Sequence, residues 1–113
     1  MPLTQWSDEI IIAEMSDEPA FSDDIGALMQ MLSTKEDWSP DIIVNMKAVT
    51  FLNSSNIAQL LKLRKRVLTG EGRLRICSVA DSVWSVILIT GLDKVFEFTD
   101  DVATSLASLQ IEP

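Results

Sequence analysis

Histidine is absent from this sequence, and cysteine occurs once, at Cys77. Without histidine, the Ser-His and Cys-His pairs that activate catalytic nucleophiles cannot form, and the commonest ligand of zinc, iron and copper is missing. The phrase G-x-x-x-x-G-K-[ST], which cradles nucleotide phosphates, is also absent. We therefore expect a protein that is not an enzyme, has no metal site and carries no cofactor.

Long apolar runs and an excess of basic residues are also missing. No run approaches the roughly 18 residues of a membrane-spanning helix, and residues 1–8 lack the apolar centre of a signal peptide. The formal net charge of -8 repels phosphate backbones and anionic lipids, so we expect neither nucleic acid nor membrane insertion. Solubility alone also explains this charge. A single cysteine excludes an intrachain disulfide, which indicates a cytoplasmic protein.

The chain of 113 residues has room for one hydrophobic core. We predict a single domain over residues 1–113, with its core at about 9–110. Strand-like and helix-like patterns alternate along it. The expected strands are 9–15, 41–46, 73–79 and 94–98, with an edge strand near 4–6; the expected helices are 21–32, 54–69, 81–90 and 100–109. This order predicts an α/β fold: a mostly parallel sheet of four to five strands with about four helices.

The connection between residues 41 and 72 is the most informative part of the chain. A buried strand is expected to continue as far as Leu52 and to turn through residues 53–56 into an amphipathic helix. We expect its apolar side to carry Ile57, Leu60, Leu61, Arg64, Val67 and Leu68, with Lys62, Lys65 and Arg66 largely opposite. Helix starts at the carboxyl ends of strands direct free N–H groups outward, which suits a partner or an anion such as a nucleotide.

Three phrases of this sequence resemble one known family. They are VTFLNSSNI at 49–57, GRLRI at 72–76 and VILITGLDKVF at 86–96. The phrases are similar to V-T-F-[LIM]-D-S-S-G-L, G-x-L-x-[LI] and L-x-x-T-G-L-x-x-[LV]-F of STAS domains, the fold of anti-sigma factor antagonists. They occur in the family's order and spacing, and the resemblance covers roughly residues 9–110.

The resemblance implies a non-enzymatic module that regulates transcription by binding an anti-sigma factor that is also a serine kinase. In the family, the first serine of the turn is phosphorylated, which releases this partner. Ser54 occupies that position here, and Ser55 is the second candidate. A phosphate adds about -1.5 to -2 charges, enough to block a close interface.

Two residues of the turn depart from the family phrase. Asn53 stands in place of aspartate and keeps one acceptor without the charge, while Asn56 stands in place of glycine. We expect the Asn56 side chain to narrow the approach to the helix start. One alternative is a constitutive scaffold or accessory subunit, stressosome-like or transporter-associated, without phospho-switching. On sequence position alone, Ser54 or Ser55 is simply the N-cap of the helix.

A second group of candidate contacts lies on the helix expected at 81–90. Trp84 and Leu88 are four residues apart, so a one-sided helix would expose them together as an apolar pair. The alternative is that both are buried against a neighbouring helix. We expect the partner-binding residues to be Asn53, Ser54, Ser55, Asn56, Trp84 and Leu88. Cys77 falls in a strand predicted to be central, where we expect an inert core thiol.

Overall fold

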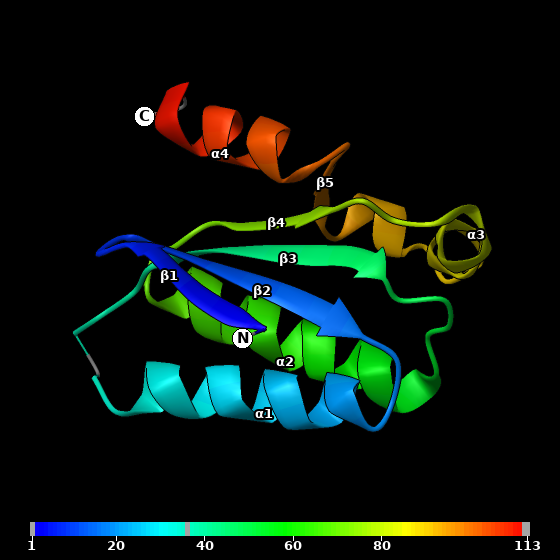
Figure 1. The fold of residues 1–113 in the computed structure, drawn as a ribbon, viewed down its shortest axis with the longest axis horizontal. Helices are drawn as coiled ribbons and strands as arrows, with labels where there is room; N and C mark the ends of the chain where they lie inside the picture. Colours follow the sequence, from blue (N-terminus) through cyan, green and yellow to red (C-terminus); the bar gives the residue numbers. More distant parts are fainter. Residues whose placement is uncertain (1, 36, 112–113) are drawn as a thin grey trace.

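The computed structural model describes residues 2–35 and 37–111 and contains one five-stranded sheet (Figure 1). Its strands are β1 (Leu3–Ser7), β2 (Ile10–Ser16), β3 (Asp41–Ala48), β4 (Leu74–Cys77) and β5 (Glu97–Thr99). They lie in the order β1-β2-β3-β4-β5, with β1 antiparallel to β2 and the other pairs parallel. The predicted α/β fold with an added edge strand is confirmed.

Helices cover both faces of the sheet. They are α1 (Ala20–Ser33), α2 (Ser54–Thr69), α3 (Asp81–Ile89) and α4 (Val102–Ile111), with a short 3-10 turn, η1 (Leu92–Lys94). Figure 1 shows α1 and α2 together on one face, α4 alone on the opposite face, and α3 near the end of β4. Loops at the carboxyl ends of the parallel strands therefore meet along one edge of the molecule.

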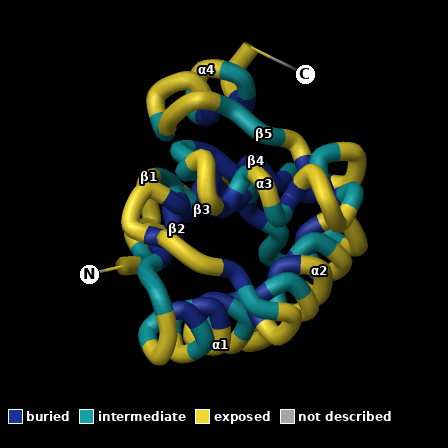
Figure 2. The backbone as a smooth tube through the Cα atoms, turned by 90° about the vertical axis from the view of Figure 1, so that its right-hand side faces the viewer, coloured by how far each residue is buried: buried dark blue, intermediate teal, exposed yellow. Residues whose placement is uncertain are grey.

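The period-2 alternation of β2 and β3 divides their apolar side chains between two core clusters. In the cluster with α1 and α2 are Ile11, Ala13, Met15, Ile42, Val44 and Met46; in the cluster under α4 are Ile10, Ile12, Ile43, Cys77 and Leu109. Figure 2 shows the middle strands as buried and the outer sides of the helices as exposed. Both faces of the central strands need apolar residues, which explains their continuous apolar runs.

Polar side chains fix both ends of α4 on the sheet. At its start, the Thr104 N–H donates to the Asp101 carboxylate at 2.7 Å, which caps the helix. At its end, Arg73 donates from Nη2 to the Leu109 carbonyl at 2.7 Å and forms an ion pair with Asp41 at 3.0 Å. The second face of the sheet is therefore closed by anchored contacts as well as by apolar packing.

Three strands end at residues other than those predicted. β3 stops at Ala48 and does not reach Leu52, because the Val49 N–H turns back to the Met46 carbonyl at 3.0 Å. β4 is limited to Leu74–Cys77. The strand expected at 94–98 is split, since η1 takes its first residue and the strand itself is Glu97–Thr99. Gly91, with φ 75° in the left-handed region, lies just past the end of α3.

Ser22 is not the N-cap of α1. The helix begins at Ala20, which places Ser22 within the first turn. The backbone N–H and the hydroxyl of Ser22 both donate to the Glu18 carboxylate, each at 2.6 Å. The carboxylate of Glu18 therefore satisfies one of the N–H groups that are left without a partner at a helix start.

The buried side of α2 also differs from the expected one. Leu63 is fully buried, whereas Leu61 and Leu68 are 39% and 46% exposed. The helix contacts both the sheet and α1, which shifts the buried stripe to Asn56, Leu60, Leu63 and Val67. Arg66 is not on a free face: its Nη2 donates to the carbonyls of Leu32 at 2.8 Å and Trp38 at 3.0 Å.

We expect Arg66→Met to lower the free energy of unfolding by about 1–3 kcal/mol, because two backbone carbonyls lose a charged donor. Urea denaturation followed by circular dichroism measures this change. Lys65→Met is the matched control, since Lys65 is exposed on the same helix, and it should change stability by less than about 0.5 kcal/mol. Equal losses from the two variants would contradict the anchoring role of Arg66.

Candidate partner-binding site

The loop after β3 is joined to its neighbours through Thr50. The carboxylate of Asp17, in the loop after β2, accepts from the Thr50 N–H at 2.8 Å and from the Thr50 hydroxyl at 2.5 Å. The Thr50 carbonyl accepts from the hydroxyl of Ser82, at the start of α3, at 3.2 Å. These bonds hold three chain segments together at the carboxyl edge of the sheet, where ligands bind in open α/β folds.

Asn53 is the N-cap of α2, and Asn56 caps it in return. The Asn53 side chain accepts from the Asn56 N–H at 2.8 Å, and the Asn56 side chain accepts from the Asn53 N–H at 3.1 Å. The prediction that Ser54 or Ser55 is the N-cap is therefore wrong; both lie in the first turn of the helix. Asn is as good a cap as Ser, and Asn53 stands one position earlier with extended backbone angles.

Asn56 does not narrow the approach to the helix, contrary to expectation. It is 1% exposed, so its side chain lies inside the molecule. Its Nδ2 donates to Gln59 Oε1 at 3.5 Å, and Gln59 Nε2 donates to the hydroxyl of Ser22 at 3.0 Å. The residue at the glycine position of the family phrase therefore links the start of α2 to α1 and leaves the outer surface of the turn open.

Ser54 and Ser55 are both exposed. Among the described residues, neither hydroxyl has a hydrogen-bond partner, so both are available to solvent or to another protein. Phe51 lies three residues before Ser54 and is 65% exposed. We name Phe51, Ser54 and Ser55 the α2 turn surface. Sequence reasoning missed Phe51 because it extended β3 through it; typical strands of about 5–6 residues would have left Phe51 in the connection.

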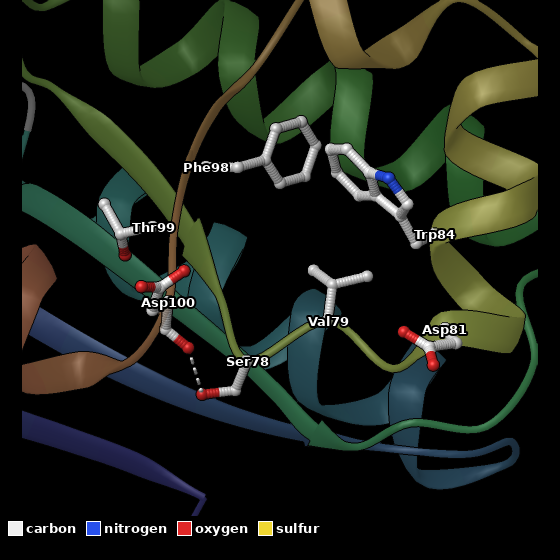
Figure 3. A pocket seen from close by; sticks show the side chains of 7 residues that line it. All are labelled: Ser78, Val79, Asp81, Trp84, Phe98, Thr99 and Asp100. Carbon is white, nitrogen blue, oxygen red and sulfur yellow. Dashed lines mark hydrogen bonds between the residues drawn. The ribbon is translucent and has the colours of Figure 1, made fainter.

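Trp84 and Leu88 do not form one exposed pair. Trp84 is partly buried and packs edge-to-face on Phe98, with ring centroids 5.1 Å apart (Figure 3). Leu88 is 51% exposed, and its neighbour Ile89, which sequence reasoning missed, is 85% exposed. Trp84 is thus held against β5 and not against a neighbouring helix, while the later part of α3 presents an apolar surface.

Comparison with known proteins identifies the family. The model described as STAS domain matches residues 6–105. The chain belongs to the STAS domain family. The resemblance found in the sequence phrases is thereby confirmed, and the α2 turn surface lies within the matched residues.

Solved STAS proteins share this fold at low sequence identity. An anti-sigma-factor antagonist domain protein from Planctomyces limnophilus is 16% identical, with a TM-score of 0.80 and 96% of each chain covered. Unphosphorylated SpoIIAA, an anti-sigma factor antagonist, is 15% identical, with a TM-score of 0.79 over 96% of this chain and 94% of that one. The phosphorylated Bacillus SpoIIAA is 15% identical, with a TM-score of 0.70 over 95% and 96%.

Three titratable side chains among the described residues have shifted pKa values, and that of Asp101 is lowered by hydrogen bonds from the N–H and the hydroxyl of Thr104. Hydrogen bonds from the hydroxyl and the N–H of Thr50 stabilise the Asp17 carboxylate and lower the pKa of Asp17. Burial raises the pKa of the Cys77 thiol, because a thiolate is poorly solvated inside the sheet. Cys77 is 0% exposed, as expected for a core thiol.

Within residues 2–35 and 37–111, no group of three or more His, Cys, Asp or Glu residues is arranged to hold a metal ion. No helix in that part of the chain is both long and apolar enough to cross a bilayer.

Asn53→Ala should lower the free energy of unfolding by about 1 kcal/mol, since one N–H group of α2 loses its cap. Thermal or urea unfolding measures the change. Ser55→Ala is the control at a neighbouring exposed position and should be nearly neutral. A larger loss for Ser55→Ala than for Asn53→Ala would show that the cap has been assigned to the wrong residue.

Thr50→Val should raise the pKa of Asp17, because the carboxylate loses the donor that lowers this pKa most. Asp17 is more acidic folded than unfolded, so its contribution to stability is present above about pH 4 and is lost as pH falls through the lowered pKa. The loss of Tm in Thr50→Val should therefore be larger at pH 7 than at about pH 2.5. Carboxyl NMR titration gives the pKa of Asp17 directly.

Thr34→Val is the control for this pH dependence. The Thr34 hydroxyl donates to the Met31 carbonyl at 2.8 Å, an acceptor that does not titrate. Its effect on Tm should be the same at both pH values. If Thr50→Val and Thr34→Val show the same pH profile, the bond between Thr50 and Asp17 does not depend on the charge of Asp17.

Proposed function

We propose that this STAS domain is a cytoplasmic regulatory protein that binds a kinase-type anti-sigma factor through the α2 turn surface and is switched by phosphorylation of Ser54. We further propose that residues 1–113 act as one domain and that the protein works by binding and not by catalysis. The observation that carries the proposal is an exposed serine, with a free hydroxyl, at the start of α2 in a member of this family.

The turn is prepared for binding before a partner arrives. Its backbone is fixed by the reciprocal bonds of Asn53 and Asn56 and by the link from Thr50 to Asp17. A surface that is already ordered loses little conformational entropy on association. Phe51 adds an exposed aromatic ring, a residue type enriched in interfaces.

The same geometry supports a switch at Ser54. A phosphate there would carry about -1.5 to -2 charges, which opposes the close approach of an apolar partner surface. The phosphate would also face the positive end of α2, so the modified domain should stay folded while its partner is released. SpoIIAA, which shares the fold, has been solved both with and without phosphate.

A constitutive scaffold or accessory subunit is the second candidate. The observation that favours it is the neutral Asn53–Asn56 pair, which replaces the aspartate and the glycine of the family phrase. In that case the α2 turn surface would remain bound to its partner whether or not the chain is modified.

We expect Ser54→Asp to weaken binding to a serine-kinase anti-sigma factor from the same genome by at least about tenfold, because one charge enters a closely packed interface. Isothermal titration calorimetry measures the affinity. Ser33→Asp adds the same charge at the exposed end of α1 and should bind like the wild type. Equal affinity of wild type and Ser54→Asp would favour the scaffold.

Intact mass after incubation with the same kinase tests the modification itself. The wild type should gain one phosphate, Ser54→Ala none, and Ser55→Ala one. Phosphate on Ser54→Ala would move the modification to Ser55, and an unmodified wild type would remove the phospho-switch while leaving partner binding to be judged by calorimetry.

A further inference from the structure

A pocket opens at the carboxyl edge of the sheet, where the loop after β4 meets the start of α3 and the end of β5. Its volume is about 270 Å³. Figure 3 shows the rings of Trp84 and Phe98 on one side of it and the carboxylates of Asp81 and Asp100 on the other, with Val79 between them. The partner-binding role proposed for the α2 turn surface does not involve this pocket.

The walls of the pocket are fixed by bonds between its own segments. The N–H of Ser78 donates to the Asp100 carbonyl at 3.1 Å, and the Ser78 hydroxyl lies 3.4 Å from the same carbonyl. Ser78 has φ 58°, a left-handed backbone conformation that residues other than glycine rarely adopt. These bonds hold the loop after β4 against the backbone of Asp100. Trp84 and Phe98 stand at 87° to each other and form a rigid aromatic wall.

The sign of the charge restricts what this pocket can bind. Its lining contains two acidic residues, Asp81 and Asp100, and no Lys or Arg, so its formal charge is -2. The whole chain carries -8. A phosphate or a nucleotide would be repelled, and a nucleotide is also large for a pocket below the usual range of about 300–1,000 Å³. The pocket is of the right size for one small group of positive charge.

Aromatic faces and carboxylates together are the chemistry that recognises organic cations. A planar guanidinium stacks on an indole ring and donates to carboxylate oxygens, and an alkylammonium group uses the same contacts less directionally. We propose that the pocket formed by Asp81, Trp84, Phe98 and Asp100 is a binding site for a guanidinium or alkylammonium group. The proposal does not require the α2 turn surface to bind a kinase.

Asp100 is a better position than Asp81 for a substitution that tests the pocket. Asp81 lies in the first turn of α3, where a carboxylate is favourable for the helix itself. Asp100 lies before α4 and outside every helix, and Asp101, not Asp100, accepts the capping bond of α4. The charge of Asp100 can therefore be removed without loss of a described side-chain bond.

The experiment titrates agmatine, which carries an alkylguanidinium at one end and an alkylammonium at the other, into the ¹⁵N-labelled full chain and follows the Trp84 indole N–H and the amides of residues 78–81. Saturable shifts at these positions are expected. N-butylurea, which has a similar butyl chain and no charge, should give none. Shifts of the same size with N-butylurea, or none with agmatine, would overturn the proposal.

Charge-removing variants test which carboxylate is used. Asp100→Asn should weaken agmatine binding roughly two- to fivefold, the effect of one exposed ion pair, and the double variant Asp81→Asn/Asp100→Asn should weaken it further. Asp24→Asn, at a half-buried position on α1, removes the same charge far from the pocket and should leave the affinity unchanged. Equal weakening of agmatine binding by Asp24→Asn and Asp100→Asn would show that only the net charge of the protein matters, and it would contradict a specific site in the pocket.

A second probe separates the two sources of such a cation. The peptide acetyl-Gly-Arg-Gly-amide presents the same guanidinium on a polypeptide backbone. If the peptide binds at least as well as agmatine and is weakened by Asp100→Asn, the pocket accepts an arginine side chain of another protein. If agmatine alone binds, the ligand is a free small amine or guanidine. Either result supports a cation site in the pocket. If neither agmatine nor the peptide binds, the site is excluded.

Discussion

The hydrogen bonds between Thr50 and Asp17 hold in place the loop that leads into the candidate partner-binding site of this STAS domain. They join the loop after β3 to the loop after β2, and the Ser82 hydroxyl extends the connection to α3. The N-cap of α2, Asn53, follows Thr50 by three residues, so the start of the helix is connected directly to this anchored loop. A carboxylate holds one side of the connection, so the position of the turn depends on a charge that is itself stabilised by the bonds it accepts.

The architecture explains why the candidate surfaces lie at one edge. The paired α1 and α2 cover one face of the sheet, and α4 covers the other through its own apolar cluster. The central strands are buried on both sides over most of their length, and exposed side chains such as Glu14 of β2 and Lys47 of β3 lie near their ends. The loops at the carboxyl ends of the strands carry both the α2 turn surface and the acidic pocket.

Much of the fold followed from periodicity, because a buried strand and an amphipathic helix leave distinct patterns. The details of the turn did not. Asn53, Ser54 and Ser55 are all good N-caps, and sequence gives no means to choose among neighbours of equal propensity. The inward direction of Asn56 depends on its bond to the Asn53 N–H, which only the folded turn creates. Arginine usually faces solvent, yet Arg66 donates to the carbonyls of Leu32 and Trp38, which are far from it in the sequence.

The pairing of Trp84 with Phe98 was hidden for a related reason. The two residues lie in different elements, and the strand expected at 94–98 was displaced by η1. Helical spacing relates Trp84 to Leu88 but carries no information on what faces them from β5. Short elements near a chain reversal are set by tertiary contacts, and a glycine such as Gly91 marks the reversal without fixing the residues after it.

The burial of Cys77 has a practical consequence for spectroscopy. It is the only cysteine of the chain, it is 0% exposed, and its raised pKa keeps it in the unreactive thiol form. A maleimide dye would therefore react under native conditions with a second cysteine introduced by Ser55→Cys and leave Cys77 unmodified. The protein offers a single-site fluorescent reporter at the start of α2 without removal of its native cysteine.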